Sequence, residues 1–439
     1  MMRKIFFPIL IALIFPVLAP ALPATQTAID KAIRKSVVDS VSKLLANNYV
    51  FPDKAKAMSA LLRKNLNAGT YDRLSNPEDF AARLTNDLRS VTKDRHLAVI
   101  YGPQRIAQMR CDTMDGESLP EVIRSHQRDN FGFRKVELMP GNVGYIDFRM
   151  FDNPQLPGAG AAAVSAMNFM ANAQAVIFDL RRNGGGHPEM IQLISTYLFE
   201  GEAHLNDLYT RPTNLTQQYW ILPWVPGPRL AKVPVYILTS DYTFSGAEEF
   251  SNNLRELKRA TIVGQTTGGG AHPVDFKILN DHFVLKVSIG RAINPISKKN
   301  WEGTGVQPHV PVPADSALEV AYLMALDTLA RTAPSSAERF EYDNLAAVKR
   351  AEARNLKPSS AMLDSYPGKY GIRVISADGG QLFFQRENGP KMRLVPASDR
   401  SFVIEQTGSS VSFTTGLDGR VDGFTLIRSV GDTVRCLRK

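Results

Sequence analysis

The sequence predicts an α/β protein core between an N-terminal helical module and a small C-terminal antiparallel β-domain. Three observations lead to this fold class: helical periodicity up to residue 88, apolar strands alternating with helical stretches over residues 136–329, and short strands separated by Gly-containing turns after residue 366. The chain has 439 residues, enough for two or three domains. Its composition, 44% apolar and 22% charged, is that of an ordinary globular protein and excludes wholesale disorder.

The first 24 residues predict a signal peptide. A short positive segment, residues 1–4, precedes an apolar run over residues 5–18, and small residues then lead up to Ala24. A membrane anchor is the alternative, but the run contains two prolines and is barely long enough to span a bilayer. We therefore expect cleavage and an exported protein, periplasmic or extracellular, with no stable membrane insertion afterwards.

Residues 25–93 predict a helical module. Apolar side chains recur with helical spacing over residues 27–50, and a second helix is expected over residues 53–66. The third opens with Asn76-Pro77, a capping residue followed by proline at the first helical position. The pattern changes to a strand at residues 97–101.

Residues 94–332 predict the α/β core. The expected strands lie at residues 144–148, 175–180, 233–240, 261–264 and 282–289, and the expected helices at 161–173, 188–199, 245–257 and 317–329. Alternation of this kind indicates helices layered against a sheet.

The end of the chain has a different texture. Residues 333–362 are expected to form a linker with a charged helix at 345–355, because Pro/Ser breaks flank that helix. Residues 363–439 predict a small antiparallel sandwich or barrel, since short strands alternate with turns such as Asn-Gly and Asp-Gly. Whether the only two cysteines, Cys111 and Cys436, form a disulfide is left open.

Charge and histidine spacing exclude several function classes. The formal net charge is +9, but the basic residues are scattered in twos and threes, which favours a solvated basic surface over a nucleic-acid site. No pair of the seven histidines has the spacing of a metal site such as H-E-x-x-H. We therefore expect no nucleic-acid partner, no metal and no cofactor.

Two loops are candidates for chemistry. Ser245 follows a strand and a turn and stands at the start of a helix, where free N–H groups and the helix dipole stabilise developing negative charge. The alternative is that Ser245 is an ordinary N-cap. The second loop, Gly184–Gly186, follows a buried strand and could present N–H groups to an oxyanion, although a simple glycine turn is the alternative.

Three motifs carry a resemblance to a known family. They are Asp-Leu-Arg-x-Asn-x-Gly-Gly at Asp179–Gly186, Thr-Ser-x-x-x-x-Ser-Gly-Ala-Glu-Glu at Thr239–Glu249, and Val-Gly-x-x-Thr-x-Gly-Gly at Val263–Gly270. In this order and spacing they resemble the C-terminal-processing (tail-specific) serine proteases, a family that includes the tricorn protease core and the repeats of interphotoreceptor retinoid-binding protein. The resemblance covers roughly Thr27 to Arg331 and implies the ββα spiral core shared with crotonase-like enzymes.

Two departures indicate a branch of that family. Members with a Ser–Lys dyad carry the lysine in a Thr-x-Gly-Lys-Gly loop, but residues 266–270 read Thr-Thr-Gly-Gly-Gly here. There is also no obvious room for an inserted PDZ domain. Both features are similar to the tricorn-like and retinoid-binding-protein-like branch.

The resemblance to the tricorn-like branch implies a Ser/His/Glu triad. Ser245 would be the nucleophile and His96, in Asp94-Arg95-His96-Leu97, the general base. Glu302, which precedes Gly-Thr-Gly-Val-Gln-Pro, would orient that histidine. With an unperturbed histidine pKa of about 6.5, the acid limb of kcat/KM is expected between about pH 6 and 7.5.

Backbone N–H groups would complete this site. The N–H of Gly246 and one from the glycine loop, at Gly184, Gly185 or Gly186, are expected to bind the oxyanion. Of the remaining histidines, His187 and His272 follow the two glycine loops and could line the cleft.

The sequence therefore predicts a secreted serine endopeptidase that hydrolyses peptides or the unstructured tails of proteins. The alternative is a non-catalytic binder of apolar ligands on the same fold, as the resemblance to retinoid-binding-protein repeats allows. Acyl-thioester chemistry of the crotonase kind has no matching active-site sequence here. The oligomeric state is left open.

Overall fold

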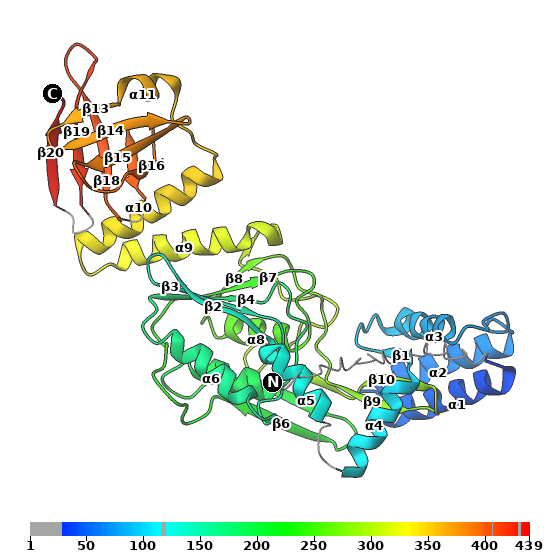
Figure 1. Cartoon of the computed structure of the whole chain (residues 1–439). Helices are drawn as coiled ribbons and strands as arrows, with labels where there is room; N and C mark the ends of the chain where they lie inside the picture. Colours follow the sequence, from blue (N-terminus) through cyan, green and yellow to red (C-terminus); the bar gives the residue numbers. More distant parts are fainter. Residues whose placement is uncertain (1–28, 116–119, 406, 429–431) are drawn as a thin grey trace, which may run out of the picture.

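The computed structural model describes residues 29–115, 120–405, 407–428 and 432–439, so the predicted signal peptide lies outside the described residues. Figure 1 shows three parts in a row: the helical module, the α/β core, and the C-terminal β-domain, which α9 (Ala317–Thr332) and α10 (Ser336–Ala353) join to the core. The fold class predicted from the sequence is confirmed. Within the described ranges, no helix is long and apolar enough to cross a membrane.

The helical module consists of α1 (Lys31–Asn48), α2 (Pro52–Asn67) and α3 (Pro77–Thr92), close to the predicted bounds. Asn76 caps α3, since its side-chain oxygen accepts the N–H groups of Glu78 and Asp79.

These helices share one apolar cluster with an antiparallel sheet. The sheet has the order β1 (Ala98–Tyr101), β10 (Phe283–Ser288), β9 (Val274–Ile278). Two of its three strands come from the later part of the chain. The module and the core are therefore interleaved, and the segments that link them run past the site described below.

The core is built on a six-stranded mixed sheet. Its order is β12 (Val310–Pro311), β8 (Thr261–Gly264), β7 (Val235–Thr239), β4 (Ala175–Asp179), β3 (Val143–Phe148), β2 (Phe133–Met139), and all neighbours are parallel except β2 and β3. Alternate side chains of each strand face opposite layers. One face packs on α6 (Ala159–Phe169), α7 (Pro188–Thr196) and α8 (Gly246–Glu256), and the other on α9.

This sheet brings the two predicted loops together. Strands β4 and β7 are parallel neighbours, so their carboxyl ends lie at the same edge. The glycine loop follows β4, and Ser245 follows β7 after a short turn. Asn183 fixes the first loop by donating from its side chain to the carbonyl of Phe148, 2.9 Å away.

Several elements were not predicted. Among them are the helices α4 (Pro103–Asp115) and α5 (Pro120–Arg128) and a three-stranded antiparallel sheet in the order β11 (Gly290–Ile293), β5 (His204–Thr210), β6 (Leu215–Trp220). Strand β6 is exposed at almost every residue, so it lacks the apolar alternation from which a strand is predicted.

The C-terminal domain is an eight-stranded antiparallel meander. Its strands are β13 (Gly368–Tyr370), β14 (Arg373–Asp378), β15 (Gln381–Arg386), β16 (Met392–Pro396), β17 (Ser401–Ile404), β18 (Ser410–Thr415), β19 (Val421–Ile427) and β20 (Thr433–Leu437), preceded by the short helix α11 (Ser360–Ser365). The N–H of Lys439 donates to the carbonyl of Lys369 over 2.9 Å, so the chain after β20 meets β13. Of the two predicted alternatives, the structure therefore favours a barrel. Aromatic side chains fill its interior, and Cys436 is a buried free thiol.

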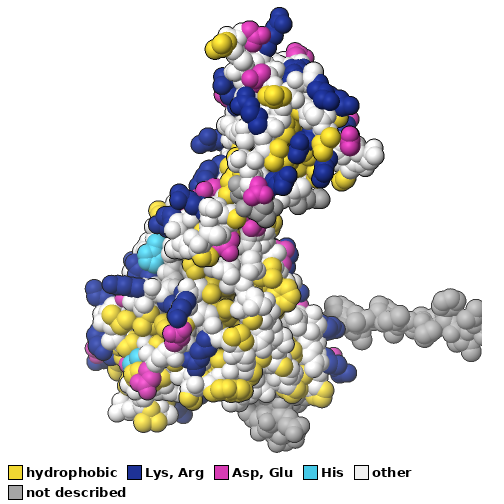
Figure 2. Space-filling model, turned by 90° about the vertical axis from the view of Figure 1, so that its left-hand side faces the viewer, with side chains coloured by type: hydrophobic (Ala, Val, Ile, Leu, Met, Phe, Trp, Pro, Cys, Tyr) yellow, Lys and Arg dark blue, Asp and Glu magenta, His cyan; other side chains and the backbone are white. Residues whose placement is uncertain are grey.

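Helix α10 is longer than predicted and is packed, although it lies in the segment expected to be a linker. Ser335 caps it, and Tyr342, Leu345 and Ala346 join the apolar cluster on α9. On the face shown in Figure 2, Lys and Arg side chains are spread over the molecule among acidic and apolar ones.

Candidate active site

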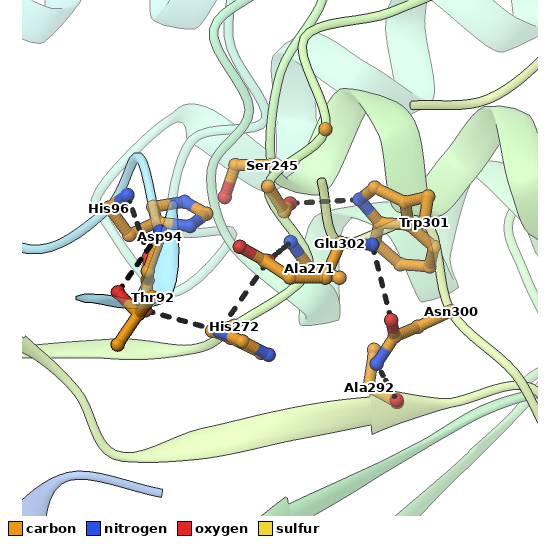
Figure 3. Close-up of polar contacts among 12 residues, drawn as sticks. Thr92, Asp94, His96, Ser245, Ala271, His272, Ala292, Asn300, Trp301 and Glu302 are labelled. Carbon is orange, nitrogen blue, oxygen red and sulfur yellow. Dashed lines mark hydrogen bonds and ion pairs between the residues drawn. The ribbon is translucent and has the colours of Figure 1, made fainter. Parts of the chain in front are cut away.

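A cavity of about 460 Å³ lies at the carboxyl edge of the core sheet, between the two glycine loops and residues of β9 and β10. Ser245 and His96 both line it, together with Gly186 and Gly246. Figure 3 shows the ring of His96 extending toward Ser245. His187 and His272 also line the cavity, as the sequence predicted.

Ser245 has an unusual backbone conformation. Its φ of 55° and ψ of −122° lie outside the extended region typical of an N-cap, although it stands directly before α8. A non-glycine residue in such a region costs roughly 1–3 kcal/mol and persists only where its surroundings enforce it. The strain therefore argues against an ordinary N-cap and for a residue held for function.

Glu248, one turn into α8, enforces this geometry. Its carboxylate accepts the N–H of Ser245 at 2.8 Å, of Gly269 at 2.7 Å and of Gly270 at 2.8 Å, and the hydroxyl of Thr267 at 2.5 Å. Burial raises the pKa of Glu248, while these donors oppose the increase. One carboxylate thus ties the serine to the second glycine loop. The Ser-x-x-Glu spacing of a capping box was the sequence signal for this role.

Close backbone packing explains the glycines of the first loop. A methyl group on Gly186 would lie 1.9 Å from the carbonyl oxygen of Phe151, and one on Gly185 would lie 2.7 Å from Cβ of Ser245. Both residues also have positive φ, 106° at Gly185 and 141° at Gly186. No other residue type fits these two positions.

The structure removes Gly185 from the predicted oxyanion-binding groups. The N–H of Gly185 is occupied, since it donates to the side-chain oxygen of Asn183 at 2.9 Å, and Gly185 does not line the cavity. Within the described residues, the N–H groups of Gly186 and Gly246 donate no hydrogen bond. A methyl on Gly246 would lie 2.9 Å from the backbone nitrogen of Gly186, so the two are adjacent. They can both point to one developing oxyanion.

His96 lies in the segment between α3 and β1 and is only 2% exposed. Its backbone N–H donates to Asp94 at 2.9 Å, and its ring packs against Phe244 with centroids 4.6 Å apart. Burial lowers the pKa of His96 to about 3, and the charge of Lys286 adds to this effect, whereas Asp94 opposes it. The imidazole is therefore neutral at physiological pH, as a general base must be.

The carboxylate of Glu302 contacts the loop after Gly270 rather than the ring of His96. It accepts the N–H of Ala271 at 2.6 Å and lies 3.5 Å from Nδ1 of His272. In the described part of the chain, neither Nδ1 of His96 nor Oε1 of Glu302 has a hydrogen-bond partner. The predicted contact between these two residues is therefore absent from this structure. The reason is that the loop after Gly270 places His272 against Glu302.

Asp94 is the carboxylate that contacts both histidine segments. It accepts the backbone N–H of His96 and lies 3.2 Å from Nδ1 of His272, and the hydroxyl of Tyr49 donates to it at 3.1 Å. Burial alone would raise its pKa, but the hydrogen bond and charge of His272 outweigh this and lower the pKa of Asp94 to about 2. Asp94 belongs to the Asp-x-His segment of the sequence, in which only His96 was predicted to have a role.

The carboxyl of Glu302 differs from that of Asp94. Burial raises the pKa of Glu302 to about 7, and Asp94 raises it further, while His272 opposes. Ligand atoms of Asp94, His272 and Glu302 lie within 4.8 Å of one another, a spacing that could hold a metal ion. The imidazole of His272 lies within reach of both carboxylates, and this accounts for the cluster without a metal. Figure 3 shows this cluster beside Ser245 and His96.

Two family models match parts of this chain, and several solved structures are similar to it. The model of peptidase family S41 matches residues 142–312, and a model of the N-terminal domain of peptidase S41 in eukaryotic IRBP matches residues 24–132. A proposed S41 protease of Bacteroides fragilis is 22% identical, over 43% of this chain and 52% of that one, with a TM-score of 0.38. A proposed peptidase of Parabacteroides merdae is 18% identical, over 67% and 96% of the two chains, with a TM-score of 0.47.

A third solved structure, the photosystem II D1 C-terminal processing protease, is 16% identical over 66% of this chain and 94% of that one, with a TM-score of 0.41. The matched part of the chain thus spans about half of the Bacteroides protein and nearly all of the other two. The two family models together cover more than half of the chain, and the S41 model spans Ser245, both glycine loops and Glu302. The chain therefore contains a domain of peptidase family S41, a family of serine peptidases, preceded by the N-terminal domain of that family.

Proposed function

We propose that this protein is an exported serine endopeptidase in which Ser245 attacks the peptide carbonyl and His96 takes its proton. One observation carries the proposal: a serine in a strained backbone conformation shares a cavity with a buried neutral histidine and with two unpaired N–H groups. A hydroxyl is inert at neutral pH without a base, and the oxyanion that forms on attack needs donors that are already in place.

The chemistry follows from these groups. As Oγ of Ser245 bonds to the carbonyl carbon, its proton passes to His96, and the N–H groups of Gly186 and Gly246 hold the oxyanion. His96 then gives the proton to the leaving amine, which departs and leaves an acyl-serine. A water molecule, deprotonated by His96, attacks the ester, and the acid product leaves with Ser245 restored.

The carboxylate that stabilises the transient imidazolium is Asp94 in this proposal. Its charge raises the pKa of His96, and no such effect comes from Glu302. Glu302 acts on His96 only indirectly. It contacts the N–H of Ala271 and the ring of His272, and these contacts fix the loop after Gly270. A methyl on Gly270 would lie 2.6 Å from Cε1 of His96, so the position of that loop sets the position of the base.

The substrate is proposed to be a peptide or an unstructured protein segment. The cavity is open to solvent at His187, which is half exposed, and an extended chain can reach Ser245 from outside. The apolar-ligand alternative gives no reason for a strained serine beside unpaired N–H groups. Export is inferred from the order of charge, apolar run and small residues in the first 24 residues.

The test is cleavage of an unstructured protein such as casein, with products identified by mass spectrometry. We expect internal cuts by the wild type and none by Ser245→Ala. Ser240→Ala is the matched control, because the Ser240 hydroxyl donates to the carbonyl of Arg181 at 2.6 Å and Ser240 does not line the cavity. Undiminished cleavage by Ser245→Ala would contradict the proposal, and trimming only from one end would contradict the endopeptidase part.

A further inference from the structure

The floor of the cavity holds a carboxyl group that the proposed mechanism does not use. Glu249 lies one turn beyond Ser245 on α8, about 6 Å further along the helix axis, and it lines the cavity although it is only 7% exposed. The carboxylate of Glu248 accepts four hydrogen bonds. No such set of donors holds the carboxyl of Glu249, and among the described residues no cation acts on it. A buried carboxylate without a counter-charge is costly and calls for an explanation.

The surroundings of Glu249 are polar and come from several elements. The amides of Asn206 on β5 and Asn253 on α8 lie beside its carboxyl, and Glu189 on α7 lies near enough to act on it by charge. Both side-chain polar atoms of Asn206, and both of Asn253, are buried without a hydrogen bond of normal geometry. Glu249 is therefore the cavity-lining member of a polar cluster whose asparagine amides, behind the lining, have hydrogen-bonding capacity left over.

The raised pKa of Glu249 shows that its charged form lacks a counter-charge. Burial raises its pKa to about 7, and Glu189 raises it further, whereas Asn206 and Asn253 oppose the shift. A cation entering the cavity would favour the ionised form and would pair with it away from bulk water.

The position of His96 indicates which half of the substrate lies toward Glu249. The leaving amine must receive its proton from His96, so that half of the substrate lies toward His96, where Lys286 also lines the cavity. Glu249 has other neighbours, on β5, α7 and α8. The acyl half of the substrate is thus the half whose side chain can enter the pocket toward Glu249.

We propose that Glu249 determines the specificity of the site by pairing with a lysine or arginine side chain on the acyl side of the scissile bond. The inference rests on the proposed peptidase function. The apolar stem of such a side chain fits the lining by Leu208, Pro188 and Ala292, and its flexible length matches the one helical turn between Ser245 and Glu249.

The test uses three peptides that differ only in the residue on the acyl side: lysine, the isosteric apolar norleucine, and glutamine. With the wild type, we expect kcat/KM for the lysine peptide to exceed that for norleucine by roughly 30- to 1,000-fold, the range that paired buried charges give. In Glu249→Gln that ratio should fall at least tenfold. The ratio does not depend on how much of the variant is folded. Glu256→Gln, on the same helix but outside the cavity lining, is the control and should keep the ratio.

Calorimetric binding of the same peptides to Ser245→Ala and to Ser245→Ala/Glu249→Gln separates this inference from the proposed function. Tighter binding of the lysine peptide, lost in the double variant, supports the role of Glu249 even if no hydrolysis is found and the peptidase proposal fails. Equal binding of lysine and norleucine peptides, or a preference that survives Glu249→Gln, overturns the inference while leaving hydrolysis by Ser245 intact.

Discussion

Replacing Glu248 by glutamine tests how the serine and the second glycine loop are held together. In the wild type, Oε2 accepts the N–H groups of Ser245 and Gly270, and Oε1 accepts the hydroxyl of Thr267 and the N–H of Gly269. A glutamine has only one oxygen. Its best orientation keeps that oxygen at the Oε2 position and turns its NH₂ toward Thr267, whose hydroxyl can accept it.

The cost follows from this count. The N–H of Gly269 loses its partner, which costs about 1–3 kcal/mol for a buried donor, and the two remaining bonds lose charge assistance worth up to about 1 kcal/mol each. Burial raises the pKa of Glu248, which means that its charged form is unfavourable there. Removing that charge therefore offsets part of the lost stability. We expect Glu248→Gln to lower the free energy of unfolding by about 2 kcal/mol.

The same change should reduce activity. Gly270 packs against both His96 and Phe244, so a looser loop displaces the base, and a displacement near 1 Å can cost about a hundredfold in rate. Urea denaturation and kcat/KM on a casein-derived peptide measure the two effects. The control is Glu256→Gln, whose carboxylate pairs with the adjacent Arg255 at 3.1 Å and which should change stability by less than about 0.5 kcal/mol. Lost stability with unchanged kcat/KM would refute the idea that this loop positions His96.

Three further changes have defined outcomes. Gly186→Ala should cost at least a hundredfold in kcat/KM, because its methyl would lie 1.9 Å from the Phe151 carbonyl oxygen and displace an oxyanion donor; near-normal kinetics would contradict that role. Because burial lowers the pKa of His96 to about 3, the base stays neutral as the pH falls. We therefore expect kcat/KM for a neutral peptide to stay constant down to about pH 5, and not to fall between pH 6 and 7.5. A decrease of kcat/KM between pH 6 and 7.5 would show that the imidazole is solvated. A chain ending at Asn355 should stay folded and cleave small peptides. A chain ending at Ala333 should have a lower melting temperature, because α10 covers an apolar face of α9. Equal melting temperatures of the two chains would contradict this packing.

Local signals account for the elements that were predicted well. Asn76-Pro77 marks the start of α3, and Ser245 with Glu248 marks the start of α8. Buried strands such as β4 and β7 are continuous apolar runs and were placed within about two residues. These signals depend on neighbouring residues alone, so the sequence displays them directly.

The features that were missed depend on contacts between distant segments. Strand β6 carries mostly polar, exposed side chains, and the pairing of β10 with β1 joins residues that are distant in the sequence, such as Lys286 and Ala98. The partner of Glu302 depends on the path of the loop that carries His272, and no spacing in the sequence records that path. The contact of Asp94 with His272 also depends on the path of this loop. Likewise, no sequence spacing shows that the N–H of Gly185 donates to Asn183 and is therefore not available to an oxyanion. Residue types at the site could thus be predicted, but their pairing could not.

The most direct measurement is the rate at which a fluorophosphonate probe labels the protein, read by intact mass and by mapping of the labelled peptide. The wild type should gain one adduct, at Ser245, because only a serine with an adjacent base attacks the probe at neutral pH. His96→Ala should lose labelling by several orders of magnitude. His272→Ala should slow it much less, since Nδ1 of His272 faces Asp94 at 3.2 Å and Glu302 at 3.5 Å and the proposal gives this ring no part in proton transfer. Labelling of His96→Ala at the wild-type rate, or an adduct on any other residue, would contradict the pairing of Ser245 with His96.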